Sequence, residues 1–238
     1  MRRAWQLGLL GLLLGAAPGP VVVGSFSLAG GELPEGWVPL HFPKIAEHTR
    51  YAVVQDAGTW VVRADSRASA SGLIRRVRVD LREHPILRWR WRVENVLEAG
   101  DVTRRDGDDY PARVYVTFEY DPDTLPLWQR LKYLAARALR PELPAAAISY
   151  IWASRAEPGA IVDNPYAAGF VKMIVVRSGA GEAGTWREEQ RNVLEDFRAA
   201  FGREPPPLVG VAIMTDTDNT GESAVAYYGD IVFLPDAG

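Results

Sequence analysis

The sequence predicts an all-β protein, a single β-sandwich of jelly-roll type with two peripheral helices. Residues 87–93, LRWRWRV, alternate strictly between apolar and arginine side chains, and residues 112–120, ARVYVTFEY, alternate between apolar and mostly polar ones. A period of two is typical of antiparallel strands that bury one face. About nine such runs, separated by turns rich in Gly, Pro and Asp, favour two packed sheets.

The first element is expected to be a secretory signal peptide over residues 1–24. Two arginines precede the apolar run AWQLGLLGLLLGAA, and a Pro-Gly-Pro sequence ends it. This order of charge, apolar core and breaker is typical of an export signal, and the run is short for a membrane span. Cleavage is expected near Gly24 or Ala29, because Pro18 would follow a cut after Ala17. An uncleaved N-terminal anchor is the alternative.

Residues 25–238 are expected to form one β-sandwich domain, since no internal repeat or long linker divides them. Besides the two alternating runs above, strands are predicted at residues 51–55, 59–64, 73–81, 149–153, 170–177, 209–214 and 224–234.

Two segments have helical spacing instead. Residues 125–144 place leucines and alanine three or four positions apart, and residues 185–202 open with Thr185 and Glu188 at the spacing of a capping box. The second segment ends at Gly202. Its stripe of Trp186, Val193, Phe197 and Phe201 is interpreted as core, because such stripes usually pack inside.

Composition limits the kinds of site. The chain has no cysteine, which excludes disulfides, thiolate metal sites and a cysteine nucleophile. The formal net charge is −3, and no dense basic patch predicts nucleic-acid binding. No cysteine is available for lipid attachment after the signal. The expectation is a periplasmic or secreted protein with no stable membrane span after signal cleavage.

The first candidate site lies in IMTDTDNTGESAVAYYGDIVF, residues 213–233. Asp216, Asp218 and Gly221 stand at positions one, three and six of a calcium-loop pattern, in which alternate oxygens point at one hard cation. Tyr227 occupies the twelfth position, where a helical calcium hand needs glutamate, so that class is excluded. A β-loop calcium site with Glu222 as a further ligand is one hypothesis. The others are a ligand-contacting loop and a structural turn, since Asp and Asn cap turns themselves.

The second candidate site is GDDYPARVYVTFEY. Asp108 and Asp109 stand at the entrance of a strand whose polar face carries Arg113 and Tyr115. If this strand neighbours residues 87–93, then Arg88, Arg90 and Arg92 share a face with Arg113 and need carboxylate partners. A polar cleft for sugar hydroxyls or carboxylates is the functional interpretation, and a solvated charged face or a structural Arg–Asp network is the alternative.

Aromatic walls for such a cleft are expected from SYIWASRAEPGAIVDNPY. Tyr150 and Trp152 share a strand face, and Asn164 and Tyr166 follow in a loop. A tryptophan inside an apolar run is also a common core residue, so a core position for Trp152 is the alternative.

Catalytic constellations are scarce. The three histidines lack metal-ligand spacing, and neither a nucleophile elbow nor a glycine-rich phosphate loop occurs. Glu119 and Asp121 stand two apart at a strand end, which is a weak signal for a glycosidase carboxylate pair.

Several blocks together resemble a bacterial family catalogued as domain of unknown function three thousand and forty-seven. The resemblance extends from about Trp37 to Leu234 and is carried by SASGLIRRVRVDL, PILRWRWRV, GDDYPARVYVTFEY, YIWAS, EEQRNVLEDFRAAFG and GVAIMTDTDNTGESAVAYYGDIVF. It implies an exported bacterial protein with an all-β core similar to galactose-binding or lectin-like jelly rolls. It transfers no catalytic residue.

The functional expectation is a non-catalytic binding module for carbohydrate or another cell-envelope polymer. A glycoside hydrolase-like enzyme using Glu119, Asp121 or the Asp108/Asp109 pair, and a purely structural envelope protein, are the alternatives. The candidate ligand-binding residues are Asp108, Asp109, Arg113, Tyr115, Arg90, Trp152, Asn164, Asp216, Asp218 and Asn219, and the candidate calcium ligands are Asp216, Asp218 and Glu222.

Overall fold

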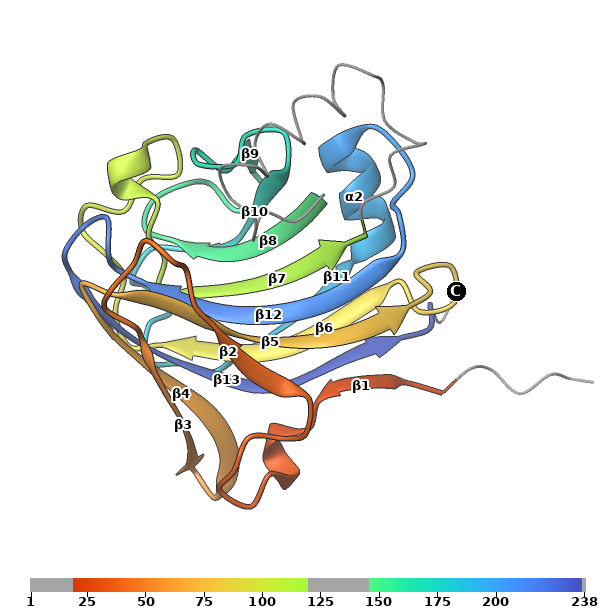
Figure 1. Ribbon diagram of the computed structural model, residues 1–238, viewed down its shortest axis with the longest axis horizontal. Coiled ribbons are helices and arrows are strands. Elements are labelled where there is room, and N and C mark those ends of the chain that lie inside the picture. Colours follow the sequence, from red (N-terminus) through yellow and green to blue (C-terminus); the bar gives the residue numbers. More distant parts are fainter. Residues whose placement is uncertain (1–18, 120–145, 237–238) are drawn as a thin grey trace, which may run out of the picture.

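Two β-sheets pack face to face in the computed structural model, which describes residues 19–119 and 146–236 (Figure 1). The six-stranded sheet has the order β11 (Arg187–Asn192), β6 (Ile86–Val93), β13 (Ser223–Leu234), β4 (Thr59–Arg67), β3 (Arg50–Asp56), with β1 (Val21–Gly24) also beside β13. The seven-stranded sheet has the order β2 (Trp37–Leu40), β5 (Ala70–Val79), β12 (Leu208–Asp216), β7 (Ala112–Phe118), β8 (Ala146–Ala153), β10 (Val171–Ser178), β9 (Ile161–Asp163). The predicted all-β class is confirmed.

The main core lies between the two sheets, where the apolar faces of the alternating strands meet. Trp89 and Trp91 of β6 are buried, and they meet side chains of β8 in the opposite sheet. The ring centroids of Trp89 and Tyr150 are 5.2 Å apart, and those of Trp91 and Trp152 are 5.9 Å apart. Trp152 is therefore a core residue.

Strand β8 is buried along its whole length, because its other face is covered as well. On that outer side, Ile151 and Met173 pack with Tyr110 in a second apolar cluster. Burial on both faces explains why the run AAISYIWA lacks the alternation of the other strands. It also places Tyr110, which precedes β7, against the outer face of the seven-stranded sheet.

The predicted helix over residues 185–202 is wrong in its first third. Arg187–Asn192 is strand β11, and the α-helix α2 spans Val193–Phe201. The buried Glu189 explains the strand: it accepts a hydrogen bond from Trp91 Nε1 at 3.0 Å and pairs with Arg177 at 2.7 Å. The capping box of Thr185 and Glu188 is therefore not used.

Asn192 caps α2 instead, because its side chain accepts from Glu195 N at 3.1 Å. Gly202 ends the helix at φ 67°, as expected. Within the described residues α2 is the one α-helix, so two peripheral helices are not supported. The other predicted helix, over residues 125–144, lies outside those residues. Two short 3-10 helices, η1 (Phe26–Leu28) and η2 (Arg105–Gly107), complete the described elements.

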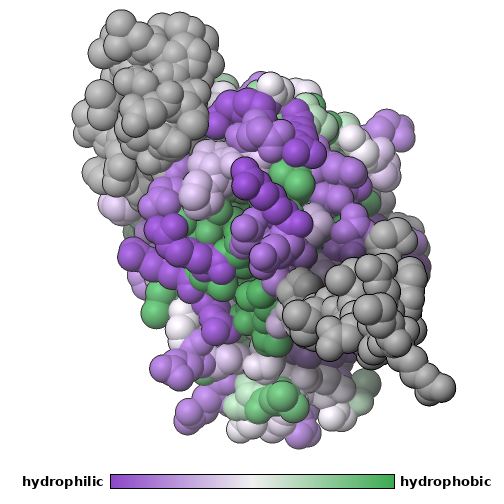
Figure 2. Space-filling model, turned by 90° about the vertical axis from the view of Figure 1, so that its right-hand side faces the viewer, coloured by the Kyte–Doolittle hydropathy of each residue, from purple (hydrophilic) through white to green (hydrophobic). Residues whose placement is uncertain are grey.

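The arginines of β6 do not share a face with Arg113, contrary to the expectation. β6 and β7 belong to different sheets. Arg92 pairs with Asp56 at 3.1 Å, and the Arg90 guanidinium lies 4.8 Å from the centre of the Trp186 ring. Figure 2 shows hydrophilic residues over much of one face, with hydrophobic residues gathered between them. No helix among residues 19–119 and 146–236 is long and apolar enough to cross a membrane.

Candidate functional site

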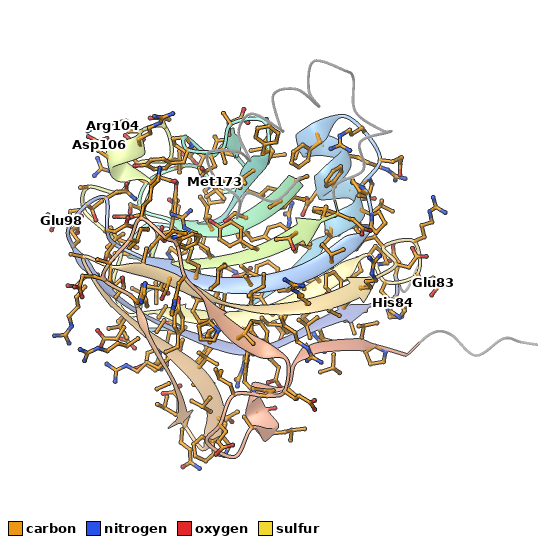
Figure 3. The ribbon with its side chains drawn as sticks, in the orientation of Figure 1. Glu83, His84, Glu98, Arg104, Asp106 and Met173 are labelled. Atoms are coloured by element: carbon orange, nitrogen blue, oxygen red, sulfur yellow. The ribbon has the colours of Figure 1, made fainter. Side chains whose placement is uncertain are left out.

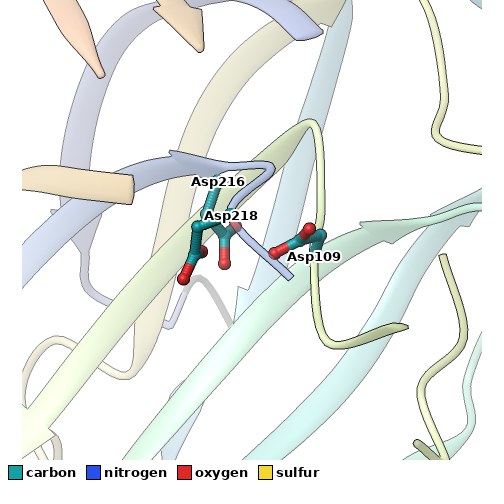
Figure 4. Close-up of side chains that lie close together, drawn as sticks. All are labelled: Asp109, Asp216 and Asp218. Atoms are coloured by element: carbon teal, nitrogen blue, oxygen red, sulfur yellow. The ribbon is translucent and has the colours of Figure 1, made fainter. Parts of the chain in front are cut away.

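Four aspartates meet at one end of the molecule, and we call this group the acidic junction: Asp108, Asp109, Asp216 and Asp218. The fold explains the meeting. β7 and β12 are antiparallel neighbours, with Arg113 opposite Met214, so the start of β7 lies beside the end of β12. The loop before β7 and the loop after β12 therefore reach the same place. Arg104 and Asp106, in and next to η2, mark this end in Figure 3, and Figure 4 shows three of the carboxylates.

A buried ion pair forms the floor of the acidic junction. Arg113 Nε donates to Asp216 Oδ1 at 2.8 Å, and Nη2 donates to Asp216 Oδ2. Both side chains are almost completely buried. The same guanidinium donates to Tyr115 Oη at 3.0 Å and to the carbonyl oxygen of Asp108 at 2.5 Å. The guanidinium thus has hydrogen-bond partners in the loop before β7, in β7 itself and at the end of β12, and it holds these segments together.

Asp108 is buried beside this pair and is only partly satisfied. Its Oδ2 accepts from Asn164 Nδ2 at 2.7 Å. Its Oδ1 has no hydrogen-bond partner among the described atoms and lies 3.7 Å from Arg113 Nη1. The hydroxyl of Tyr110 is buried as well and forms no close hydrogen bond. Its interaction with Asp108 partly offsets the rise in the pKa of that carboxyl, and buried polar atoms left this loosely bonded are rare in native proteins.

Asp109 ties the two loops together. Its Oδ2 accepts from the backbone N and the side-chain Oγ1 of Thr220 at 2.6 and 2.8 Å, and its Oδ1 accepts from Asn219 Nδ2 at 3.0 Å. Asn219 in turn accepts a hydrogen bond from the Tyr166 hydroxyl. Asp218 and Asn219 are half-buried, and Tyr166 is exposed, so these three residues form the rim of the acidic junction.

A network of buried hydroxyls fixes the strand end that carries Asp216. Thr215 Oγ1 lies 2.8 Å from both the Pro111 carbonyl oxygen and the Tyr228 hydroxyl. Thr217 Oγ1 lies 2.9 Å from Ser66 Oγ. These contacts alternate with the acidic residues along the chain, so Asp216 and Asp218 project from a backbone that is held on its other side. The geometry of the acidic junction is therefore preorganised.

Three of the carboxylates have the geometry of a cation site. Asp109, Asp216 and Asp218 each offer an oxygen, and these oxygens lie within 4.8 Å of one another. Oxygen ligands at this spacing suit a hard cation, and calcium accepts six to eight of them at about 2.3–2.6 Å. Asp109 is the carboxylate of this group that the calcium-loop pattern could not reveal, because it comes from a different segment.

Burial controls the protonation of the acidic junction. Burial raises the pKa of Asp218, and the nearby charge of Asp109 raises it further. Burial also raises the pKa of Asp108, against the pull of Arg113. The pKa of Asp216 is raised by burial and lowered by Arg113, with a net upward direction. The two hydrogen bonds from Arg113 nevertheless need an ionised carboxylate as their acceptor, so we take Asp216 as ionised. Burial lowers and Asp216 raises the pKa of Arg113, and the net direction is upward.

The structure brings together seven of the predicted ligand-binding residues and Tyr115 at their edge: Asp108, Asp109, Arg113, Asn164, Asp216, Asp218 and Asn219. It places three other predicted residues elsewhere. Trp152 lies in the core, and Arg90 lies on the other sheet. The carboxylate of Glu222 accepts from the backbone N atoms of Glu98 and Ala99, both at 2.9 Å, so it closes a neighbouring loop.

Tyr110 and Thr220 were not recognised as partners of the acidic junction. Tyr110 packs its ring 4.1 Å from the Arg113 guanidinium, and its backbone N donates to Asp216 Oδ1 at 3.3 Å. The signal was present in GDDYPAR, because an aromatic residue between two aspartates and an arginine is well placed to cover an ion pair.

Solved structures resemble the chain only distantly. A β-1,2-glucanase from Parabacteroides distasonis is 11% identical with a TM-score of 0.43, over 92% of this chain and 26% of that one. The chain thus spans about a quarter of that protein. The xyloglucanase domain of NopAA from Sinorhizobium fredii is 9% identical with a TM-score of 0.45, over 89% and 100% of the two chains. A Cel12A-derived cellulase of Rhodothermus marinus is 12% identical with a TM-score of 0.35, over 82% and 99%.

These scores carry no argument about what the chain binds or does. No curated protein matches the sequence. The model of the family described as protein of unknown function (DUF3047) matches residues 35–232, which include the acidic junction, all of strands β2 to β12 and most of β13. The chain therefore belongs to the DUF3047 family.

Proposed function

We propose that this protein is an exported, non-catalytic binding module of jelly-roll type, and that its ligand site is the acidic junction. The observation that carries the proposal is the imbalance of charge there. Four carboxylates surround one buried guanidinium, and three of them have oxygens within 4.8 Å of one another. Buried carboxylates that outnumber their cations destabilise a fold unless protons or another cation compensate them.

A divalent cation, calcium in the first place, is the compensating ion that this donor set favours. All the donors are oxygens, and Asp218 is open to solvent on one side. Solvent access leaves coordination positions for a bound molecule. Asn219 and Tyr166 stand on the rim with an amide and a phenol, which are groups that suit sugar hydroxyls. The ligand class is carbohydrate or another polymer of the cell envelope, bound through the cation.

The contacts of two carboxylates favour binding over hydrolysis. Glu119 is held by Arg78 through two bonds of 3.0 and 3.2 Å, and both oxygens of Asp109 accept from the loop after β12. A glycosidase needs two carboxylates that face a sugar from opposite sides, with an oxygen free to move a proton. Asp121 lies outside the described residues. The alternative of a purely structural envelope protein differs from the proposal in one respect: it expects no ligand at the acidic junction.

Calcium titration calorimetry tests the proposal. The wild-type protein, stripped of metal, should bind one calcium ion with a dissociation constant of about 10⁻³ M or tighter, in the range of extracellular calcium modules. Asp218→Asn should weaken binding about tenfold or more. Asp65→Asn is the matched control, because Asp65 forms only surface ion pairs with Arg63 and Arg67. Absence of binding to the wild type would overturn the cation site.

Glycan binding is tested separately, on a glycan array with calcium and with chelator. Binding should require calcium and should fall in Asn219→Ala, whose amide lies on the rim. Calcium binding without any glycan or envelope-polymer binding would reject the proposed ligand and leave a structural cation site. Turnover of a glycan by the wild type, lost in Asp218→Asn, would replace the binding proposal with the hydrolase alternative.

A further inference from the structure

The N-terminal strand β1 is part of the folded sandwich although it lies within the residues expected to be removed on export. Val21 pairs with Phe233 and Val22 with Val232, so β1 extends the six-stranded sheet along β13. Val23 is completely buried, and so is Phe26 just after the strand. The rings of Phe26 and Trp37 pack against each other in a tilted arrangement, with centroids 5.2 Å apart. Residues 21–26 are therefore core residues.

Hydrogen bonds fix the same segment on both sides of β1. The carbonyl oxygen of Val23 accepts from Trp37 Nε1 at 3.1 Å and from the Arg75 guanidinium. After the strand, Ser27 N donates to Asp230 Oδ1 at 2.8 Å. Before the strand, the His84 ring nitrogen Nε2 lies 2.7 Å from the carbonyl oxygen of Gly19. Figure 3 labels His84 on the side of the molecule away from Arg104 and Asp106. The contacts thus include Gly19, the first residue that the structure describes.

The sequence offers few bonds that an export peptidase would cut. Such enzymes need small residues at the first and third positions before the bond. Ahead of β1, this pattern occurs at Ala17, with Gly15, and at Gly19, with Ala17. Proline follows in both cases, as Pro18 and Pro20. Proline lacks an N–H and has a fixed φ, so it is a poor residue just after the bond of a peptide bound in extended form.

The remaining bonds lie inside the folded part of the chain. A cut after Gly24, which has Val22 at the third position, would remove β1, and a cut after Ser27 or Ala29, where the small-residue pattern is complete, would remove Phe26 as well. Removal of a buried phenylalanine side chain alone costs about 3–5 kcal/mol. Cleavage at a bond that the sequence leaves open would therefore remove residues that the fold needs.

We propose that the exported protein keeps its N-terminal apolar segment, uncut, and stays attached through it to the membrane it crosses. The apolar segment is shorter than a standard membrane span, so the attachment is weaker than that of a full transmembrane helix. The protein would then act as a tethered module at the membrane surface. This inference concerns processing and does not depend on the ligand at the acidic junction.

Intact mass and fractionation of the exported full chain, carrying a C-terminal tag, test the inference. The wild type should have the mass of the uncut chain and should leave the membrane fraction only with detergent. Pro18→Ala removes the block after Ala17, so this variant should be cut there and released. Its melting temperature should equal that of the wild type in detergent, because β1 is kept. Pro43→Ala, in an exposed loop, is the control and should behave as the wild type.

Any other wild-type product overturns the inference. A wild-type chain that begins at Pro18, Pro20, Ser25 or Gly30 would show that the segment is removed. Uncut protein in the soluble cytosolic fraction would show that it is not a membrane attachment. Two truncated chains test the structural step: a chain starting at Gly19 should fold normally, and a chain starting at Gly30 should lose most of its stability. Equal stability of the two chains would show that the fold does not need β1 and Phe26.

Discussion

Asp109 and Asp218 lie in one site, although Asp109 belongs to the loop before β7 and Asp218 to the loop after β12. An oxygen of each carboxylate lies within 4.8 Å of the other and of Asp216. Asp109 also holds the loop of Asp218 through Thr220 and Asn219. Asp109 therefore positions Asp218.

Calcium is expected to stabilise the protein, because an ion that binds only the folded state adds stability by mass action. At a hundredfold excess over the dissociation constant the gain is about 2.7 kcal/mol, or roughly 5–10 °C in melting temperature for a domain of this size. Differential scanning fluorimetry of metal-free protein with and without calcium measures it. Asp218→Asn should show less than half the shift, and Asp65→Asn should show all of it. Equal shifts in both variants would place the ion elsewhere.

Arg113→Met is expected to destabilise the fold strongly, because it leaves Asp216 buried without its cation. Breaking one side of a buried ion pair costs about 3–5 kcal/mol. Urea unfolding at neutral pH measures the loss. Arg78→Met is the control: its pair with Glu119 is exposed and should contribute less than about 1 kcal/mol. A loss for Arg113→Met as small as that of the control would contradict the role assigned to the arginine.

Metal-free protein is expected to become more stable on mild acidification. The pKa values of Asp108 and Asp218 are raised by burial, so the folded state binds protons that the unfolded state has already released. Stability then falls as the pH rises from about 4, the unfolded value, through the folded pKa values. Groups with a lowered pKa, such as Asp106 and Glu204, oppose this only near and below about pH 4.

Urea unfolding at pH 5 and pH 7, without calcium, measures this dependence. Saturating calcium should flatten or reverse it, because the ion competes with the protons. The double variant Asp108→Asn, Asp218→Asn should lose most of the dependence. A metal-free wild type that is less stable at pH 5 than at pH 7 would contradict the assignment.

Gly107→Ala is expected to disturb the acidic junction by displacing the loop that leads into it. A Cβ at Gly107 would lie 2.8 Å from the backbone N of Asp101 and 3.0 Å from the carbonyl oxygen of Ala99. Those backbone atoms have little room to move, so the loop that carries Asp108 and Asp109 must shift. We expect calcium affinity to fall at least tenfold in calorimetry. Gly181→Ala, with no atom near its Cβ, should bind as the wild type does.

Phe26→Ala is expected to cost about 3–5 kcal/mol, as for other buried aromatic side chains. Phe26 is completely buried between β1 and Trp37, whereas Leu28 is 84% exposed two residues later. Leu28→Ala should therefore change the unfolding free energy by less than about 0.5 kcal/mol. Urea unfolding of both variants provides the measurement. Similar values for the two would show that the segment near β1 is loosely packed.

The strands were predictable because their signal is local. LRWRWRV and ARVYVTFEY each form one strand, since alternate side chains must face the core. The choice of neighbours is not local, and the assumption that these two strands adjoin failed for that reason. REEQRN was missed as a strand because its buried residue is Glu189, whose charge is compensated by Arg177 from β10. An apolar pattern cannot reveal a strand that buries a charge.

The acidic junction was predictable in its residue types and only partly in its members. The DTDNTG loop and the GDDYPAR loop attract notice because aspartates cluster in each. Their meeting follows from the antiparallel pairing of β7 and β12. Glu222 fitted the calcium pattern by spacing, but its carboxylate serves the backbone of residues 98 and 99. Spacing along one loop cannot tell which oxygens face inward when a second loop supplies ligands.

The pairing of β1 with β13 has a consequence for biogenesis. Strand β1 hydrogen-bonds to residues 231–233, which are synthesised about 210 residues later. The six-stranded sheet therefore cannot be completed on the ribosome until β13 has been synthesised. Contacts so far apart in sequence also slow folding. A chain whose first described strand must wait for β13 stays incompletely folded for most of the time between the synthesis of the two strands.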